Sequence, residues 1–179
     1  MNKNIRWITE TALLLALLVT LQFLTKSFGQ LVTGSCVNAV LAVAALVGGL
    51  GCGITVALIS PILAFLLGIA PQILTVPAIM AGNTVYVLVL FLLANSKKPL
   101  RKIAGWLLAA AAKFVTLYAI VVGLLCGVLS ESLLASGTMK PPMLTALPVT
   151  FSWPQLITAL IGGAVALAVV PVLKKALHK

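Results

Sequence analysis

The sequence predicts an all-α integral membrane protein, a compact bundle of six transmembrane helices with both termini in the cytoplasm. Composition is the first observation, because 62% of the 179 residues are hydrophobic and 8% are charged. Such a chain has too few polar groups to cover a soluble domain. Length is the second observation: six spans of roughly 20 residues need about 120 residues. The remainder suffices for short connections, so we expect a single membrane domain over residues 1–179.

The third observation is the position of the basic residues. All but three of the twelve lie near the two ends of the chain or in the run 97–102. Cytoplasmic loops of membrane proteins collect Lys and Arg, so these three places predict one side of the membrane. The helix count is then even both before and after the central run. Positive-inside charge and contact with anionic lipid account for the net charge of +10, and no nucleic-acid partner is expected.

Apolar stretches between polar or glycine-rich segments predict the individual helices. The second and third are short for a bilayer core, and Pro61 is expected to kink the third. Trp153 and Pro154 suit the start of the last one. The expected ranges are about 8–24, 37–47, 54–67, 78–94, 103–128 and 154–173.

The connections are predicted from polar and glycine-rich composition. Residues 25–35 and 68–76 are expected as outer loops, and the glycine cluster 48–53 as a turn without charge. The region 130–154 is expected as one extended loop, long enough to fold over a site.

Lys113 lies inside an apolar segment, unlike the other basic residues. A Lys at the centre of a spanning helix costs about 2.5–3.5 kcal/mol on insertion scales, so a partner is expected. The two acids of the chain, Glu10 and Glu131, are predicted near the inner end of the first helix and in an outer loop. The missing negative charge could therefore belong to a carboxylate ligand. The alternatives are a Lys held by backbone carbonyls and waters, or one left uncharged in the apolar interior.

Asn83 is expected at a similar depth to Lys113. At 1.5 Å per residue, Asn83 lies about 8–10 Å below the outer end of its helix and Lys113 about 15 Å above the inner end of its own. Those depths overlap in a hydrocarbon core of about 30 Å. Tyr86 shares a face with Asn83, and Thr116 shares one with Lys113. Interhelical hydrogen bonding that only stabilises the bundle is the alternative.

Other polar and aromatic residues map to outer helix ends or outer loops. With the loop 130–154 they form a predicted cap above Asn83 and Lys113, and a mostly apolar pocket with a few polar groups suits a small ligand. Trp153 could instead anchor the chain at the membrane interface. The cap residues are Gln30, Ser35, Asn38, Gln72, Trp153 and Gln155. The predicted substrate-binding residues are Gln30, Asn38, Gln72, Asn83, Tyr86, Lys113, Thr116 and Trp153.

The sequence lacks the motifs of several functional classes. It has no P-loop, no HExxH, and a single histidine at the penultimate position. Two acids cannot supply the carboxylates for membrane hydrolysis or a cation-conducting ring. Cys36, Cys52 and Cys126 are scattered, so neither a disulfide framework nor a zinc site is expected. We expect no enzymatic activity, no metal and no cofactor.

Ala12 and Ala16 form a small-xxx-small pair in the first predicted helix, a spacing that lets another helix approach closely. With this pair, six short helices, cytoplasmic termini and an outer polar cap, the chain resembles the substrate-binding S component of energy-coupling factor (ECF) vitamin transporters. The stretches Thr33–Asn38 and Pro77–Asn83 resemble the group of these components that includes pantothenate and related vitamin carriers. The resemblance covers essentially the whole chain.

The resemblance implies a mechanism and partners. In this family the S component captures a vitamin on the outer side of the plasma membrane of a bacterium. It docks on a transmembrane coupling protein powered by two cytoplasmic ATPases and topples to release its cargo. Ala12 and Ala16 match the docking motif. Binding residues vary with the vitamin, so Asn38, Asn83 and Lys113 rest on the physical argument alone.

A carboxylate vitamin or precursor such as pantothenate or nicotinate would suit Lys113, and cationic thiamin would not. If Lys113 is uncharged, ligands such as riboflavin or a queuosine precursor remain possible. One rival function is an autonomous secondary carrier or small channel, which the lack of intramembrane acids and of internal repeats disfavours. The other is a non-transport scaffold subunit, in which Lys113 would be an interhelical anchor.

Overall fold

The computed structural model describes residues 3–69, 72–96 and 98–177. Within these ranges the chain is helical and forms no strand. Pro71 of the second predicted outer loop, Lys97 and Lys179 of the basic groups, and His178 lie outside the described residues. The helices are α1 (Lys3–Thr25), η1 (Lys26–Phe28), α2 (Gln30–Val43), η2 (Ala44–Gly48), α3 (Leu50–Leu66), η3 (Ile73–Thr75), α4 (Val76–Val89), η4 (Leu90–Ala94), α5 (Pro99–Leu117), η5 (Tyr118–Val128), α6 (Ser130–Ala135), α7 (Met143–Thr150) and α8 (Trp153–Ala176).

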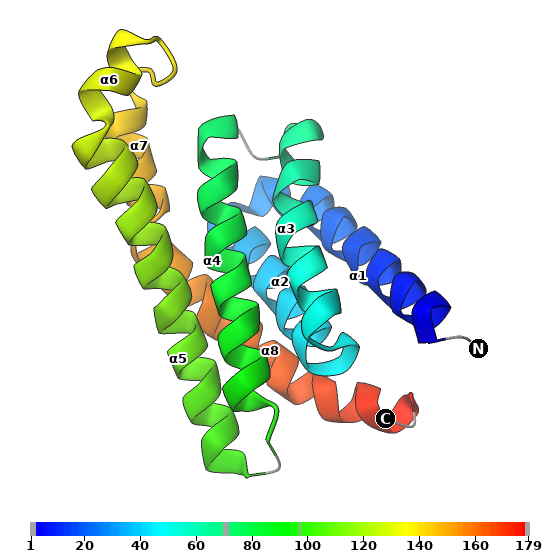
Figure 1. Cartoon of the computed structure of the whole chain (residues 1–179). Helices are drawn as coiled ribbons and strands as arrows, with labels where there is room; N and C mark the ends of the chain where they lie inside the picture. The colour runs from blue at the N-terminus through cyan, green and yellow to red at the C-terminus, as the bar shows by residue number, and fades with distance from the viewer. Residues whose placement is uncertain (1–2, 70–71, 97, 178–179) are drawn as a thin grey trace.

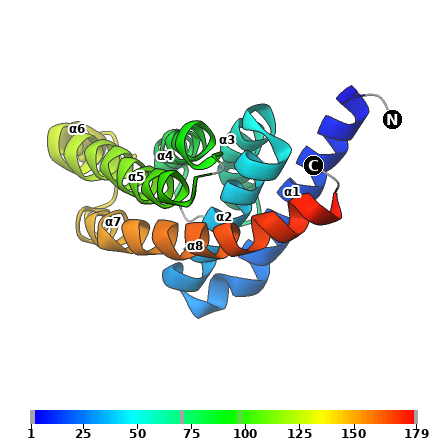
Figure 2. The same cartoon turned by 90° about the horizontal axis from the view of Figure 1, so that it is seen from below.

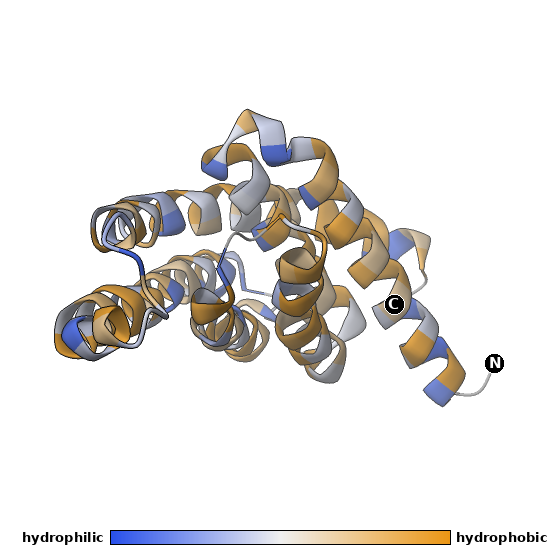
Figure 3. Cartoon of the chain, turned by 90° about the horizontal axis from the view of Figure 1, so that it is seen from above, coloured by the Kyte–Doolittle hydropathy of each residue, from blue (hydrophilic) through white to orange (hydrophobic). Residues whose placement is uncertain are grey.

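Several helices continue directly into π-helical segments and form longer apolar rods. In the described part of the chain, five helical stretches are long and apolar enough to cross a membrane, and α3 is a shorter apolar helix of 17 residues. Hydrophobic residues occur along all of the long helices (Figure 3). Large apolar side chains such as Leu13, Leu66 and Val115 face outward. The molecule is therefore a multi-pass membrane protein, since lipid is the solvent that favours such a surface.

The helices form a bundle in which α4 packs between α3 and α5, and α2 packs against α8 (Figure 1). Helix α8 runs obliquely across the bundle from α7 to the C-terminus, and α1 lies at the edge against α2 and α3 (Figure 2). The apolar core includes Leu41, Val56, Tyr86 and Leu90, all fully buried.

Small residues bring the central helices close together. A Cβ atom on Gly162 of α8 would lie 2.5 Å from the Ser35 carbonyl oxygen of α2. A Cβ atom on Gly82 of α4 would lie 2.7 Å from Leu117 Cγ of α5. Both contacts are shorter than side chains tolerate, so glycine at these positions permits the approach. The helix pairs α2–α8 and α4–α5 are therefore closely packed at these positions.

The central basic loop and the C-terminal end of α8 lie at the same end of the molecule. Lys174 Nζ donates a hydrogen bond to Asn95 Oδ1 at 3.3 Å. Trp7 of α1 lies near Gly51 at the start of α3, within 3.4 Å of the position that a Cβ would occupy. The grouping agrees with the charge pattern, and the cytoplasmic location of this end stays a prediction.

Two predicted connections are wrong. Residues 30–35 were expected in an outer loop, but they form the first turns of α2, where Ser35 Oγ donates to the Leu31 carbonyl at 2.6 Å. Residues 130–154 were expected as one extended loop, but they contain α6 and α7. In each case polar or proline-containing sequence interrupts the apolar pattern but is compatible with a helix. Ser35 bonds its hydroxyl to the preceding turn, and Pro142 lies at the N-cap of α7, where no backbone N–H is needed.

The glycine cluster also differs from expectation. The chain turns at Gly49 alone, with φ +90°, a conformation that glycine adopts without steric cost. Helix α3 begins at Leu50, includes Gly51 and Gly53, and continues through Pro61 to Leu66.

Candidate functional site

A cavity of about 260 Å³ lies inside the bundle, toward the end that carries the α3–α4 connection and α7. All of the long helices contribute to its walls; α7 contributes Ala146, Leu147 and Thr150, and Phe151 follows directly after α7. The polar lining residues are Gln22, Gln30, Thr33, Asn38, Ser60, Gln72, Thr75, Asn83, Lys113, Thr150 and Gln155. A small, largely apolar cavity with several polar groups is typical of a site for a small molecule.

Lys113 occupies the cavity wall together with two asparagines. Its Nζ atom donates hydrogen bonds to Asn38 Oδ1 at 2.6 Å and to Asn83 Oδ1 at 2.7 Å. All three side chains are at most 3% exposed. The predicted proximity of Asn83 and Lys113 is confirmed, and the partners of the Lys are side-chain amides rather than the backbone carbonyls considered above.

The helices that meet at the cavity hold this cluster in place. Asn38 Nδ2 donates to the Gly34 carbonyl at 2.9 Å and to Thr158 Oγ1 of α8 at 3.2 Å. The Tyr86 ring lies with its centroid 5.5 Å from Lys113 Nζ, and its hydroxyl donates to the Ala159 carbonyl at 3.1 Å. The Lys therefore meets two amide oxygens and an aromatic face, which are the groups that attract a cation.

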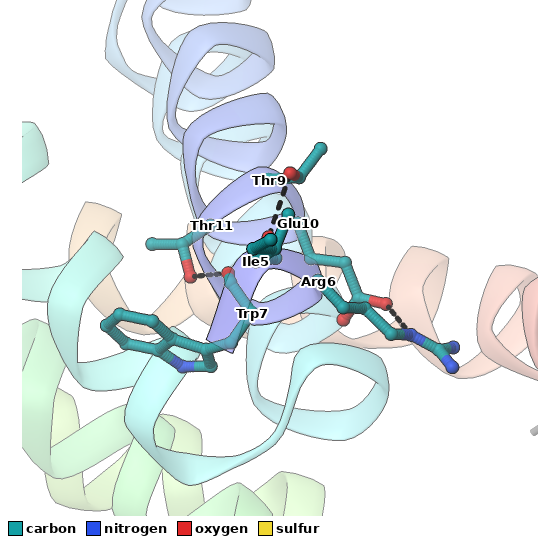
Figure 4. A network of polar contacts seen from close by, with 6 residues as sticks. All are labelled: Ile5, Arg6, Trp7, Thr9, Glu10 and Thr11. Carbon is teal, nitrogen blue, oxygen red and sulfur yellow. Dashed lines mark hydrogen bonds and ion pairs between the residues drawn. The ribbon is translucent and has the colours of Figure 1, made fainter. Parts of the chain in front are cut away.

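The two acids of the chain lie far from this cluster along the sequence and make other contacts. Glu10 accepts a hydrogen bond from Arg6 Nε at 2.9 Å on the first turns of α1 (Figure 4). Glu131 lies in the first turn of α6 and is exposed. Within the described residues, no carboxylate contacts Lys113.

Three buried side-chain atoms in the described part of the chain have no hydrogen-bond partner. They are Gln22 Oε1, Gln72 Oε1 and Asn83 Nδ2. All three belong to residues that line the cavity. Buried polar groups are nearly always paired with protein or water, so these atoms are the ones that the cavity offers to a bound molecule or to water.

The predicted binding residues fall into two groups. Gln30, Asn38, Gln72, Asn83 and Lys113 line the cavity. The remaining three do not line it, and they are Tyr86, Thr116 and Trp153.

Each of these three has another contact. Tyr86 lies behind Lys113 in the core, fully buried. Thr116 Oγ1 donates to the Ala112 carbonyl of its own helix at 2.8 Å. Trp153 is 66% exposed and stacks on Phe114 with ring centroids 5.7 Å apart. Residues three apart on one helix are rotated by about 60° from each other, which is enough to turn Thr116 away from the cavity.

Sequence reasoning missed Gln22, Ser60 and the lining face of α7. Gln22 and Ser60 are uncharged polar residues inside apolar stretches, and that placement is itself a signal for an interior-facing position. No comparable signal existed for α7, because its lining face depends on how it folds back over η5 and α8.

Ala12 and Ala16 lie on the exposed face of α1. Large apolar side chains of the same helix, including Ile8 and Leu13, are also exposed. This edge helix therefore presents a surface on which small residues permit close approach.

Comparison with protein families gives one match. The family of the ECF transporter substrate-specific component matches residues 6–174. Searches of curated proteins and of solved structures each found no match. Members of the matched family are transport subunits rather than enzymes, and they associate with an energy-coupling module of ATPases and a transmembrane coupling protein. Because the match spans nearly the whole chain, the protein belongs to the family of ECF transporter substrate-specific components.

Proposed function

We propose that this S component captures a small carboxylate-bearing vitamin or precursor, such as pantothenate or nicotinate, in the cavity beside Lys113. The observation that carries the proposal is a buried Lys that lines a cavity and contacts no carboxylate among the described residues. A Lys inside the membrane is costly without a counter-charge. A ligand carboxylate would supply that charge at the point where the cavity meets the Lys.

The cavity also limits the ligand by size and charge. Its volume of about 260 Å³ is close to the lower end of the range for small-molecule sites. A cationic vitamin such as thiamin would place like charges together beside Lys113, which costs several kcal/mol. A small acid therefore suits the site better than a large or cationic vitamin.

The proposed orientation places the cavity toward the outside of the plasma membrane of a bacterium, and both termini in the cytoplasm. The basic loop after η4 and the end of α8 are at the opposite end from the α3–α4 connection, which contributes Gln72 to the cavity. Basic residues favour the cytoplasmic side. Delivery would follow docking of α1, through Ala12 and Ala16, on the coupling protein powered by two ATPases.

A thermal-shift screen of the purified protein tests the ligand class. The panel contains pantothenate, nicotinate, riboflavin and thiamin, because a ligand that binds only the folded state raises its stability with concentration. We expect a saturating shift from one of the acids and none from thiamin. The shift should disappear in Lys113→Met, which keeps the length of the side chain and removes its charge.

Lys174→Met is the matched control, because Lys174 also donates to an asparagine oxygen but lies at the opposite end of the molecule. It should leave the shift intact. An equal shift in wild type and Lys113→Met would refute the role of Lys113, and a shift from riboflavin alone would refute the carboxylate class.

A further inference from the structure

The unpaired polar atoms of the cavity differ in what they require. Asn83 Nδ2 is a donor and needs an acceptor, whereas Gln22 Oε1 and Gln72 Oε1 are acceptors and need donors. They belong to different elements, since Asn83 lies in α4, Gln22 near the end of α1, and Gln72 just before η3. The cavity thus presents an unpaired donor on one element and unpaired acceptors on two others.

The orientation of Asn83 is fixed by its neighbour. An ammonium group has donors but no acceptor, so the oxygen of Asn83 must face Lys113 Nζ and its Nδ2 must point elsewhere. The same reasoning orients Asn38, whose Nδ2 is already bonded to the Gly34 carbonyl and Thr158. Asn83 is therefore the amide of the pair with a free donor.

Lys113 has a further hydrogen to donate. An ammonium carries three N–H donors, and two of them are used by Asn38 and Asn83. Within the described residues no third hydrogen-bond acceptor contacts Nζ. One N–H of Lys113 and one of Asn83 thus make a pair of neighbouring donors, which matches the two oxygens of a carboxylate.

The two glutamines and the Lys113 cluster occupy different parts of the cavity wall. Gln72 precedes α4, and Asn83 is about 10 Å along that helix from Val76 at 1.5 Å per residue. Gln22 is in the last turn of α1, beside the α2 residues that line the same cavity. A ligand group that reaches both glutamines must therefore stand some distance from the carboxylate.

We infer that the ligand is an acid with two poles: a carboxylate held by Lys113 and Asn83, and a distal group with hydroxyl or amide N–H donors held by Gln22 and Gln72. This inference rests on the proposed function and narrows it. A hydroxyl both donates and accepts, so it pairs with an amide side chain in either orientation. Among the acids considered, pantothenate has this pattern, while nicotinate has a carboxylate and no N–H or O–H donor at its far end.

The test measures dissociation constants by titration calorimetry with the purified full chain. The probes are pantothenate, nicotinate and a dideoxy analogue of pantothenate in which hydrogen replaces both hydroxyl groups. We expect pantothenate to bind at least about tenfold more tightly than the dideoxy analogue, since a site built to hydrogen-bond a hydroxyl discriminates against its absence. Nicotinate should bind more weakly than pantothenate.

The double variant Gln22→Leu/Gln72→Leu tests whether the two glutamines cause the preference for pantothenate over its dideoxy analogue. It should weaken pantothenate binding and leave the dideoxy analogue within about twofold, because the interaction lost on the protein is the one already missing from the analogue. Thermal unfolding without ligand reports whether the variant is folded. The single variants Gln22→Leu and Gln72→Leu provide the same comparison if the double variant does not fold.

The outcomes separate this inference from the proposed function. If the dideoxy analogue binds wild type as tightly as pantothenate does, the two-pole inference is wrong and the carboxylate proposal stands. If the glutamine variants weaken both ligands equally, the glutamines do not contact the distal group and the inference again fails. If none of the three acids binds, or if all bind Lys113→Met as they bind wild type, the proposed function fails and the inference fails with it.

Discussion

Lys113 and its two asparagines form a cluster in which each side chain fixes the orientation of the next. Thr158 and the Gly34 carbonyl hold Asn38, and Asn38 and Asn83 hold the Lys by their oxygens. A charge in this interior is tolerated because strong acceptors replace water. Both Lys–Asn hydrogen bonds are made, but neither acceptor carries a full negative charge, so Lys113 has hydrogen-bond partners and no counter-charge, while one of its N–H groups and Asn83 Nδ2 stay unpaired.

The variant Asn83→Asp tests that distinction. A carboxylate at this position would pair directly with Lys113 and would repel a ligand carboxylate. We expect thermal stability without ligand to be equal to wild type or higher, and affinity for pantothenate to fall at least about tenfold, because like charges brought together in a site cost several kcal/mol. Asn95→Asp, next to Lys174 at the other end, is the matched control for stability and affinity.

Unchanged pantothenate affinity in Asn83→Asp would mean that the ligand carboxylate binds elsewhere. Titration calorimetry on both variants and on wild type supplies the comparison.

At the scale of elements, the cavity depends on how closely α2 approaches α8. Gly162 faces the α2 backbone, where an added Cβ would lie 2.5 Å from the Ser35 carbonyl oxygen and 2.7 Å from the Ala39 nitrogen. Backbone atoms cannot move aside as a flexible side chain can. The separation of the two helices, and with it the position of Asn38, therefore depends on glycine at this place.

The substitution Gly162→Ala should lower the melting temperature in detergent, with a cost of about 1–3 kcal/mol for overpacking. It should also weaken ligand binding, because Asn38 moves with α2. Gly123→Ala is the matched control, since a Cβ at Gly123 meets nothing within 4 Å, and alanine favours helix over glycine. If both variants melt at the wild-type temperature, the close α2–α8 contact is not a constraint.

The sequence predicted where the long helices end better than where they begin. The predicted ends at residues 94 and 128 agree with η4 and η5, because apolar runs stop abruptly there. The start of α2 was placed seven residues late, since Gln30, Thr33 and Ser35 read as a loop although helix geometry accommodates them. A hydropathy pattern cannot distinguish a polar loop from a helical turn that faces a polar cavity.

The same limit applied to the site. The similar depth of Lys113 and Asn83 could be predicted from their positions in two long apolar helices, whereas the contact itself depends on the packing of α4 against α5. The contribution of α7 could not, since it depends on a tertiary path through α6 and back. Thr116 was predicted to bind substrate because of its spacing from Lys113, and Trp153 because of its position at a helix end. Neither criterion fixes the direction of a side chain.

At the scale of the whole molecule, the two ends differ in their content of basic residues. The end near Asn95 and Lys174 carries basic residues, while the other end carries α6, α7 and the cavity. The outward-facing surface between them is apolar. We propose that the line between these two ends lies along the membrane normal with the basic end in the cytoplasm, as the positive-inside rule favours.

That direction can be measured by labelling single cysteines in intact cells. In a background with Cys36, Cys52 and Cys126 replaced by Ala, Ser136→Cys between α6 and α7 should react with a membrane-impermeant maleimide. Ser96→Cys in the basic loop should react only after the cells are permeabilised. The reverse pattern would invert the proposed orientation.

The exposed face of α1 yields a prediction about delivery. Replacing Ala12 and Ala16 together by Leu should leave ligand binding by the purified chain unchanged and should abolish vitamin uptake in cells that contain the energy-coupling module. Bulky side chains would prevent the close approach of a partner helix. Ala119→Leu, on the exposed surface of η5, is the control. Normal uptake by the Ala12/Ala16 variant would show that docking uses another surface.

The most direct measurement for the central claim compares pantothenate with panthenol, its alcohol, in which a hydroxymethyl group replaces the carboxylate. Their affinities are measured for wild type and for Lys113→Met, which gives a coupling free energy between the Lys and the carboxylate. We predict that wild type prefers pantothenate by about 10- to 100-fold, as a hydrogen bond between charged groups of about 1.5–3 kcal/mol implies, and that Lys113→Met loses this preference. A preference of equal size in both proteins would contradict the pairing of Lys113 with the ligand carboxylate.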